Sequence, residues 1–70
     1  MDMNGLAFSS MRVGKRYRLV NHGERSEFVL LEVIGRNDYK LKDLNSMENY
    51  LMSDLIRYGK GEDFELREIV

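Results

Sequence analysis

The sequence contains no cysteine, no proline and no tryptophan. Without cysteine, disulfide bonds cannot brace the fold, and cysteine-ligated zinc or iron–sulfur sites are excluded. No apolar run approaches the roughly 20 residues that a membrane-spanning helix needs, and the first residues lack the charged and apolar regions of a signal peptide. We therefore expect a cytoplasmic protein with no membrane partner and no bound metal.

The chain has 70 residues, which leaves room for one domain with one thin hydrophobic core. Hydrophobic residues make up 43% of the sequence, and the formal net charge is −1. A chain this apolar and this nearly neutral differs from intrinsically disordered sequences, which combine low hydrophobicity with high net charge. The composition therefore predicts a folded domain.

Residues 1–11 show no sustained hydrophobic period and include several loop-forming residues. This pattern predicts a loose N-terminal arm in front of a folded domain at residues 12–70. Two alternatives remain open for the arm. Met11 could be a second start of translation, or Leu6 and Phe8 could cover an open edge of the domain.

Five segments of the chain have the pattern of β-strands. Residues 12–21 alternate in polarity and place Tyr17 and Leu19 on one face. Residues 28–34 form the most apolar stretch, which is typical of a bent central strand. The other three strands are predicted at residues 39–44, 48–52 and 64–69.

A short helical turn is predicted between the fourth and fifth strands. Ser53 or Asp54 is suited to begin a 3-10 or α turn, and Gly59 is suited to end it. The alternative is a longer helix at residues 47–58, where apolar residues recur at helical spacing. That helix would change the fold class from all-β to α+β.

This order of elements resembles the SH3-like small barrels, a class that includes Tudor-like and KOW-like domains. The residues that carry the resemblance are Val13–Lys15 before the first strand, the long second strand at 28–34 and the turn at 53–58 before the last strand. The resemblance covers residues 12–70 and implies an all-β, five-stranded barrel. The chain also resembles small bacterial proteins of this shape, for which the resemblance implies a fold and no activity.

A closed barrel also suits the composition, because closing the sheet removes its exposed edges without proline or cysteine. The predicted core consists of the inward-facing apolar residues of the strands and of the helical turn. These residues are Val13, Tyr17, Leu19, Phe28, Leu30, Leu31, Val33, Leu41, Leu51, Leu55, Ile56, Phe64 and Leu66.

Residues that could carry catalysis are few. The single histidine, His22, precedes Gly23 in a predicted turn, and no second histidine or cysteine is present to complete a catalytic pair. An exposed loop residue is the interpretation that this isolation favours over a proton shuttle. The Gly14-Lys15 dipeptide lacks the rest of a phosphate-binding loop. We therefore expect neither an enzyme nor a cofactor.

Charge is distributed unevenly along the chain. Four cations and no anion lie between Arg12 and Arg18, whereas residues 62–68 contain four anions and one cation. If these segments are neighbouring strands, we expect their charges to cancel across the ladder. A basic stripe on the first and third strands is the alternative candidate, for contact with single-stranded RNA. It consists of Arg16, Arg18, Lys40 and Lys42.

The leading expectation is a non-enzymatic protein-interaction module, because catalytic and metal-binding sets are missing and this class of fold mostly binds. The absence of tryptophan disfavours a proline-rich ligand. A patch of large apolar residues is the candidate surface for another protein or for a second copy of the chain. Its residues are Met47, Tyr50, Met52 and Tyr58, together with Ile56. The alternative that they close one end of the barrel remains open.

Overall fold

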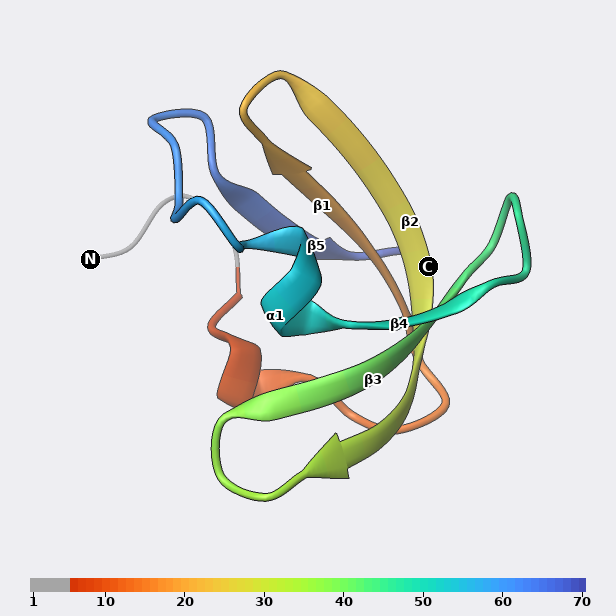
Figure 1. Ribbon diagram of the computed structural model, residues 1–70. Helices are drawn as coiled ribbons and strands as arrows, with labels where there is room; N and C mark the ends of the chain where they lie inside the picture. Colours follow the sequence, from red (N-terminus) through yellow and green to blue (C-terminus); the bar gives the residue numbers. More distant parts are fainter. Residues whose placement is uncertain (1–5) are drawn as a thin grey trace.

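The computed structural model describes residues 6–70, and five antiparallel strands in one sheet dominate it (Figure 1). The order of strands across the sheet is β4-β3-β2-β1-β5, so only β5 leaves the sequential order. The strands are β1 (Arg16–Asn21), β2 (Glu24–Ile34), β3 (Asp38–Asp43), β4 (Asn49–Leu51) and β5 (Glu65–Glu68). Two short helical turns accompany them, the 3-10 turn η1 (Phe8–Ser10) and the α-helical turn α1 (Met52–Leu55). The all-β prediction, with one helical turn before the last strand, is confirmed.

The alternative of a helix at residues 47–58 is wrong. Met47 has a φ angle of 65°, a left-handed conformation that interrupts a right-handed helix. Residues Asn49–Leu51 pair with β3 instead, with Tyr50 opposite Leu41. The helical turn that remains is four residues long, and none of the described helices is long and apolar enough to cross a membrane.

Alternation along the strands builds the core. Tyr17 and Leu19 of β1 point inward, and their partners across the sheet are Phe28 of β2 and Leu66 of β5. Their burial supplies the main stabilisation of the fold, because each large apolar side chain gains about 1.5–3 kcal/mol when it leaves water. The buried apolar residues are Met11, Tyr17, Leu19, Phe28, Leu30, Tyr39, Leu41, Met52 and Leu66.

Three residues of the predicted core are exposed. Val13, Leu31 and Val33 have 60%, 36% and 49% of their surface exposed. The pairing of β1 with β2 ends at Val29, and the register with β3 shifts after Leu30. The far half of β2 therefore extends past the core. Leu51, Leu55, Ile56 and Phe64, also predicted to lie inside, are half-buried.

The sheet is not closed into a barrel, because β4 and β5 form its two edges. The described part of the N-terminal arm packs against the open side instead of staying loose. Phe8 makes edge-on contacts with Tyr39 of β3 and with Phe64, at centroid distances of 6.0 and 5.7 Å. Leu6 donates its backbone N–H to Leu66 of β5 at 2.8 Å.

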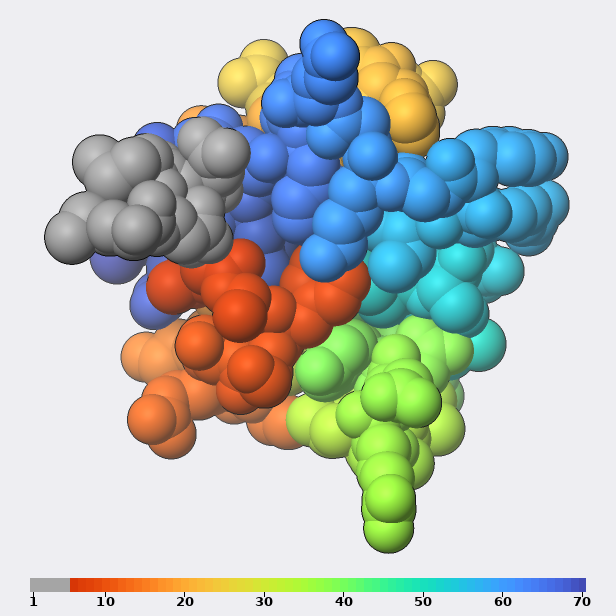
Figure 2. All heavy atoms as spheres, turned by 90° about the vertical axis from the view of Figure 1, so that its left-hand side faces the viewer, coloured from red at the N-terminus to blue at the C-terminus, as the bar shows by residue number. Residues whose placement is uncertain are grey.

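Figure 2 shows this arrangement, with the arm seated between the segment before β5 and the start of β3. The ammonium group of Lys60 lies 4.8 Å from the ring centroids of both Phe8 and Phe64, so cation–π attraction also stabilises the packing of the arm. Leu6 thus bonds to the edge strand β5, and Phe8 packs on the open side of the sheet, as in the alternative in which these two residues cover an open edge. Residues 1–5 of the predicted arm lie outside the described residues.

Candidate functional site

A hollow of about 460 Å³ separates the β1–β2 turn from α1. We call this hollow the groove. Its two walls come from parts of the chain that are thirty or more positions apart, so tertiary contacts alone create it. The groove is lined by Asn21, His22, Glu24, Asp54, Leu55 and Tyr58.

The first wall is the tight turn between β1 and β2. His22 and Gly23 have φ angles of 51° and 78°, the left-handed conformations that a two-residue hairpin turn requires. Such a conformation is unfavourable for histidine, and Asp63 compensates for it. One Asp63 oxygen accepts the backbone N–H of His22 at 2.8 Å, and the other accepts that of Gly23 at 2.7 Å.

Asn21 joins the same turn to the loop that follows α1. Its side chain is buried, with 5% of the residue exposed, and both of its polar ends are used. The amide N–H donates to the carbonyl of Gly59 at 3.1 Å, and the amide oxygen accepts the N–H of Gly61 at 2.7 Å. Asn21 and Asp63 therefore fix the position of residues 59–63 against the turn.

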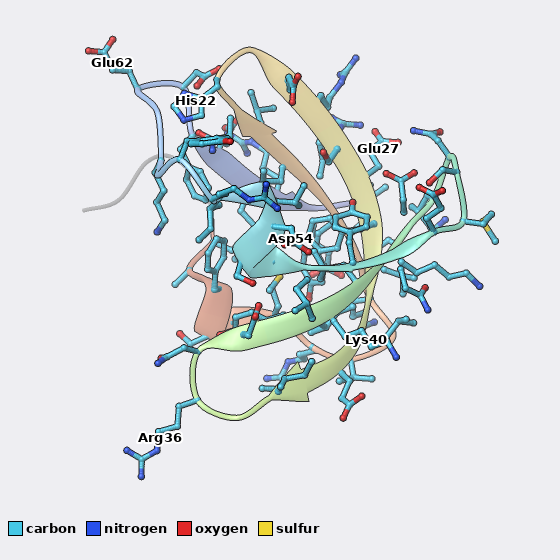
Figure 3. The ribbon with its side chains drawn as sticks, in the orientation of Figure 1. His22, Glu27, Arg36, Lys40, Asp54 and Glu62 are labelled. Carbon is cyan, nitrogen blue, oxygen red and sulfur yellow. The ribbon has the colours of Figure 1, made fainter. Side chains whose placement is uncertain are left out.

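These contacts also affect the pKa of Asp63 and the hydrogen bonding of the His22 ring. The N–H groups of Gly23 and His22, the former with the larger effect, lower the pKa of the Asp63 carboxyl. The Nε2 atom of His22 lies 3.0 Å from the carbonyl oxygen of Gly59. A carbonyl only accepts, so Nε2 carries the proton in this contact. Figure 3 shows His22 beside the loop that carries Glu62.

The second wall is α1 with the residues after it. Asp54 accepts the backbone N–H of Leu51 at 3.3 Å and forms an ion pair with Arg57 at 3.4 Å. Leu55 packs against the core, whereas Tyr58 has 85% of its surface exposed. The groove therefore combines carboxylates with one exposed aromatic ring.

The position of α1 depends on a contact with β3. Ser53 donates its hydroxyl to one oxygen of Asp38 at 2.7 Å and its backbone N–H to the other at 3.1 Å. The Ser53 hydroxyl is also the main reason why the pKa of Asp38 is lowered. Ser53 was predicted as one of two residues that could begin the turn. The turn begins at Met52, and Ser53 instead bonds α1 to Asp38 of β3.

The basic stripe is partly assembled on the outer face of the sheet. Arg16 of β1 pairs with Val29 of β2, which pairs with Lys42 of β3, so the three residues lie in one row. Within residues 6–70, neither Arg16 nor Lys42 has an ion-pair partner. Arg16 and Lys42, which we call the basic row, therefore remain available to an anion.

The other half of the stripe has acidic neighbours. Arg18 forms an ion pair with Glu27 of β2 at 3.0 Å, and Lys40 lies opposite Glu32. Figure 3 shows Glu27 and Lys40 on β2 and β3. The stripe is therefore weaker as an anion-binding surface than its four cations suggest.

The expected cancellation of charge between the first and last strands does not occur as predicted. The strands are neighbours, but the register places Arg18 opposite Arg67 and Val20 opposite Glu65. Glu65 pairs with Arg67 of its own strand at 2.6 Å. Arg18 is neutralised from the other side, by β2.

The residues of the predicted apolar patch lie in different parts of the structure. Met52 is 1% exposed and belongs to the core, so its assignment to an exposed partner surface is wrong. Met47 is 59% exposed but lies in the β3–β4 turn, on the opposite side of the molecule from the segment after α1 (Figure 1). Tyr50 is half-buried, and its burial together with Asp43 raises its pKa to about 12. Tyr58 is the one member that lines the groove.

Sequence reasoning identified the turn at Asn21–Glu24 but did not identify the groove. The roles of Asn21, Asp63 and Asp54 depend on partners distant in the sequence. The one local signal is the His22-Gly23 pair, because a residue before glycine in a tight turn often adopts a left-handed conformation.

The comparisons with known proteins add no relative. No family model matches the chain, and neither a curated protein nor a solved structure matches it. The likeness to SH3-like small barrels stays a prediction. Among residues 6–70, no group of three or more histidine, aspartate or glutamate side chains could hold a metal ion.

Proposed function

We propose that the protein is a non-enzymatic interaction module that binds a segment of a partner protein in the groove. The observation that carries this proposal is the position of Tyr58, 85% exposed at the rim of a hollow of about 460 Å³. The volume falls within the range of ligand sites, and tyrosine is enriched among residues that dominate binding energy at interfaces.

The polar groups of the groove support binding rather than catalysis. Both ends of the Asn21 amide bond to backbone groups, and Nε2 of His22 bonds to the carbonyl of Gly59. These hydrogen bonds hold the wall of the groove in place. Glu24, Asp54 and Tyr58 add two carboxylates and one exposed aromatic ring to the lining.

Site-specific photo-crosslinking tests the proposal. A benzophenone amino acid replaces Tyr58 in one variant and the exposed Arg36 of the β2–β3 turn in a control, and both are irradiated in cells that make the protein. We expect a discrete protein adduct at position 58 and none at position 36. Equal labelling at the two positions, or none at either, contradicts the proposal.

The alternative function is weak binding of single-stranded RNA, and the basic row is the observation that favours it. Arginine stacks on unpaired bases and both cations bind phosphate. Titration of an oligonucleotide at low salt tests it, with Arg16→Ala and Lys42→Ala together as the variant. Binding should weaken as salt rises, with a slope that falls by roughly 1.4 in the double variant. Absence of binding at low salt excludes this alternative.

A further inference from the structure

We infer that the groove takes the side chain of a lysine or an arginine from the partner segment. This inference rests on the proposed function and names the chemistry of the bound group. One carboxylate comes from each wall, Glu24 from the β1–β2 turn and Asp54 from α1, and none of the six lining residues is a lysine or an arginine. The ring of His22, which also lines the groove, directs Nε2 to the carbonyl of Gly59. The two carboxylates therefore complement a cation.

Asp54 already binds a guanidinium group within the chain. Its Oδ1 atom lies 3.4 Å from Arg57, while its Oδ2 atom accepts the N–H of Leu51 at 3.3 Å. The backbone contact orients the carboxylate, and the ion pair shows that one oxygen accepts a guanidinium in this orientation. Both partners of the pair are at least half exposed, so the pair is weak and an incoming cation can replace it.

Glu24 is the second acid and has no ion-pair partner among residues 6–70. It is the first residue of β2, and its pairing with Asn21 holds its backbone in the sheet. Asn21 and Asp63 fix the turn that carries Glu24 against residues 59–63, so this wall is held before a ligand binds. The binding cost of ordering the site is correspondingly small.

The apolar part of the groove suits the stem of the same side chain. Leu55 is half-buried and Tyr58 presents its ring, so a methylene chain can lie against both while its charged end reaches a carboxylate. The tyrosine ring also attracts a cation through its face. A purely apolar ligand would bury Glu24 and Asp54 without compensation, which is unfavourable.

Titration of the ¹⁵N-labelled protein with short peptides at low salt tests the inference. The probe is acetyl-Gly-Ser-Arg-Ser-Gly-amide, with a lysine version and a version in which neutral citrulline replaces arginine. We expect the backbone amide signals of Glu24, Asp54 and Tyr58 to shift with both cationic peptides. The citrulline peptide should bind roughly tenfold more weakly, since it loses the charge while keeping the shape.

Variants of the protein locate the effect. Glu24→Gln and Asp54→Asn keep the shape of the side chains, and each should weaken the arginine peptide by roughly threefold to tenfold. Arg57→Ala removes the internal competitor and should strengthen binding. Glu32→Gln is the matched control, because Glu32 is an exposed carboxylate on the sheet and should leave the affinity unchanged.

The outcomes separate this inference from the proposed function. Equal binding of the arginine and citrulline peptides overturns the cationic ligand and leaves the groove as a peptide site. No peptide binding, together with a protein adduct at position 58, overturns the inference alone. No peptide binding and no adduct overturn both. A further titration uses spermidine, a small polyamine. If spermidine shifts the signals of the same residues and binds more tightly than any peptide, the assignment of the ligand to a protein side chain is overturned.

Discussion

The groove and the basic row differ in how the chain brings their residues together. One side of the groove is the turn at Asn21–Glu24, and side-chain bonds of Asn21 and Asp63 join this turn to residues 59–63, which directly follow the other side at Asp54–Tyr58. The basic row needs no such bonds, because strand register alone places Arg16 and Lys42 on either side of Val29.

This difference separates a concave site from a flat one. The backbone of the turn is held in a left-handed conformation at His22 by groups outside the turn, and a hollow remains beside it. On the strand face, neighbouring charges compensate each other, as Arg18 and Glu27 do. We therefore propose that the groove binds a specific side chain. The basic row is proposed to contact anions in a salt-sensitive way.

The largest effect is expected for Asn21→Ala. The substitution removes two hydrogen bonds. The N–H of Gly61 loses its acceptor, and the carbonyl of Gly59 keeps only the contact with His22. Loss of a buried partner of this kind costs about 1–3 kcal/mol in the free energy of unfolding. Urea denaturation measures it.

The matched control for Asn21→Ala lies in the basic row. Arg16→Ala removes an exposed side chain with no ion pair among residues 6–70, so its effect should stay within about 0.5 kcal/mol. If the two variants are equally stable, the side-chain bonds do not hold the groove together, and the contrast between the two regions fails.

The strands could be predicted because they depend on short-range patterns. Alternation placed Tyr17, Leu19 and Leu66 correctly inside, since a period of two fixes which face a residue occupies. The prediction for Val33 depended instead on a bent strand with both faces buried, and it failed because β1 pairs with β2 only as far as Val29. Met52 was predicted to be exposed, but it is the first residue of α1 and its side chain is buried in the core.

The open sheet could not be predicted from the strands. In this sheet β4 and β5 stay unpaired edges, and the arm packs Phe8 against Tyr39 of β3 and against Phe64. The candidate site was equally hidden. Its fixed points are bonds between Asn21 and residues 59–61, and no pattern within either segment indicates its partner.

Acid should loosen the groove before it affects the basic row. Hydrogen bonds from Gly23 and His22 lower the pKa of Asp63 below its usual 3.8, and the Ser53 hydroxyl does the same for Asp38. A carboxyl with a lowered pKa stabilises the folded state above its unfolded pKa and loses that effect as pH falls through the folded value. Stability should therefore be constant near neutral pH and decline below about pH 4.

Amide NMR signals measured between about pH 6 and about pH 2 follow this loosening. The N–H signals of His22 and Gly23 should shift as Asp63 takes up a proton, ahead of the signals of Val29. In Asp63→Asn this early step should disappear. Simultaneous shifts of all three signals in the unaltered protein would show that the turn has no separate response to acid.

The smallest effect is expected on the strand face, for the ion pair between Arg18 and Glu27. The side chains are 42% and 32% exposed, so solvent screens their attraction, and a double-mutant cycle with Arg18→Ala and Glu27→Ala should give a coupling of about 0.2–1 kcal/mol. The coupling should shrink as salt is raised toward about 1 M.

The variant Glu27→Gln then tests whether the groove and the basic row are independent. It releases Arg18 beside Arg16, so RNA affinity at low salt should rise if the basic row binds RNA, while the arginine peptide should bind the groove as before. A rise in peptide affinity in Glu27→Gln would mean that the two regions are not independent.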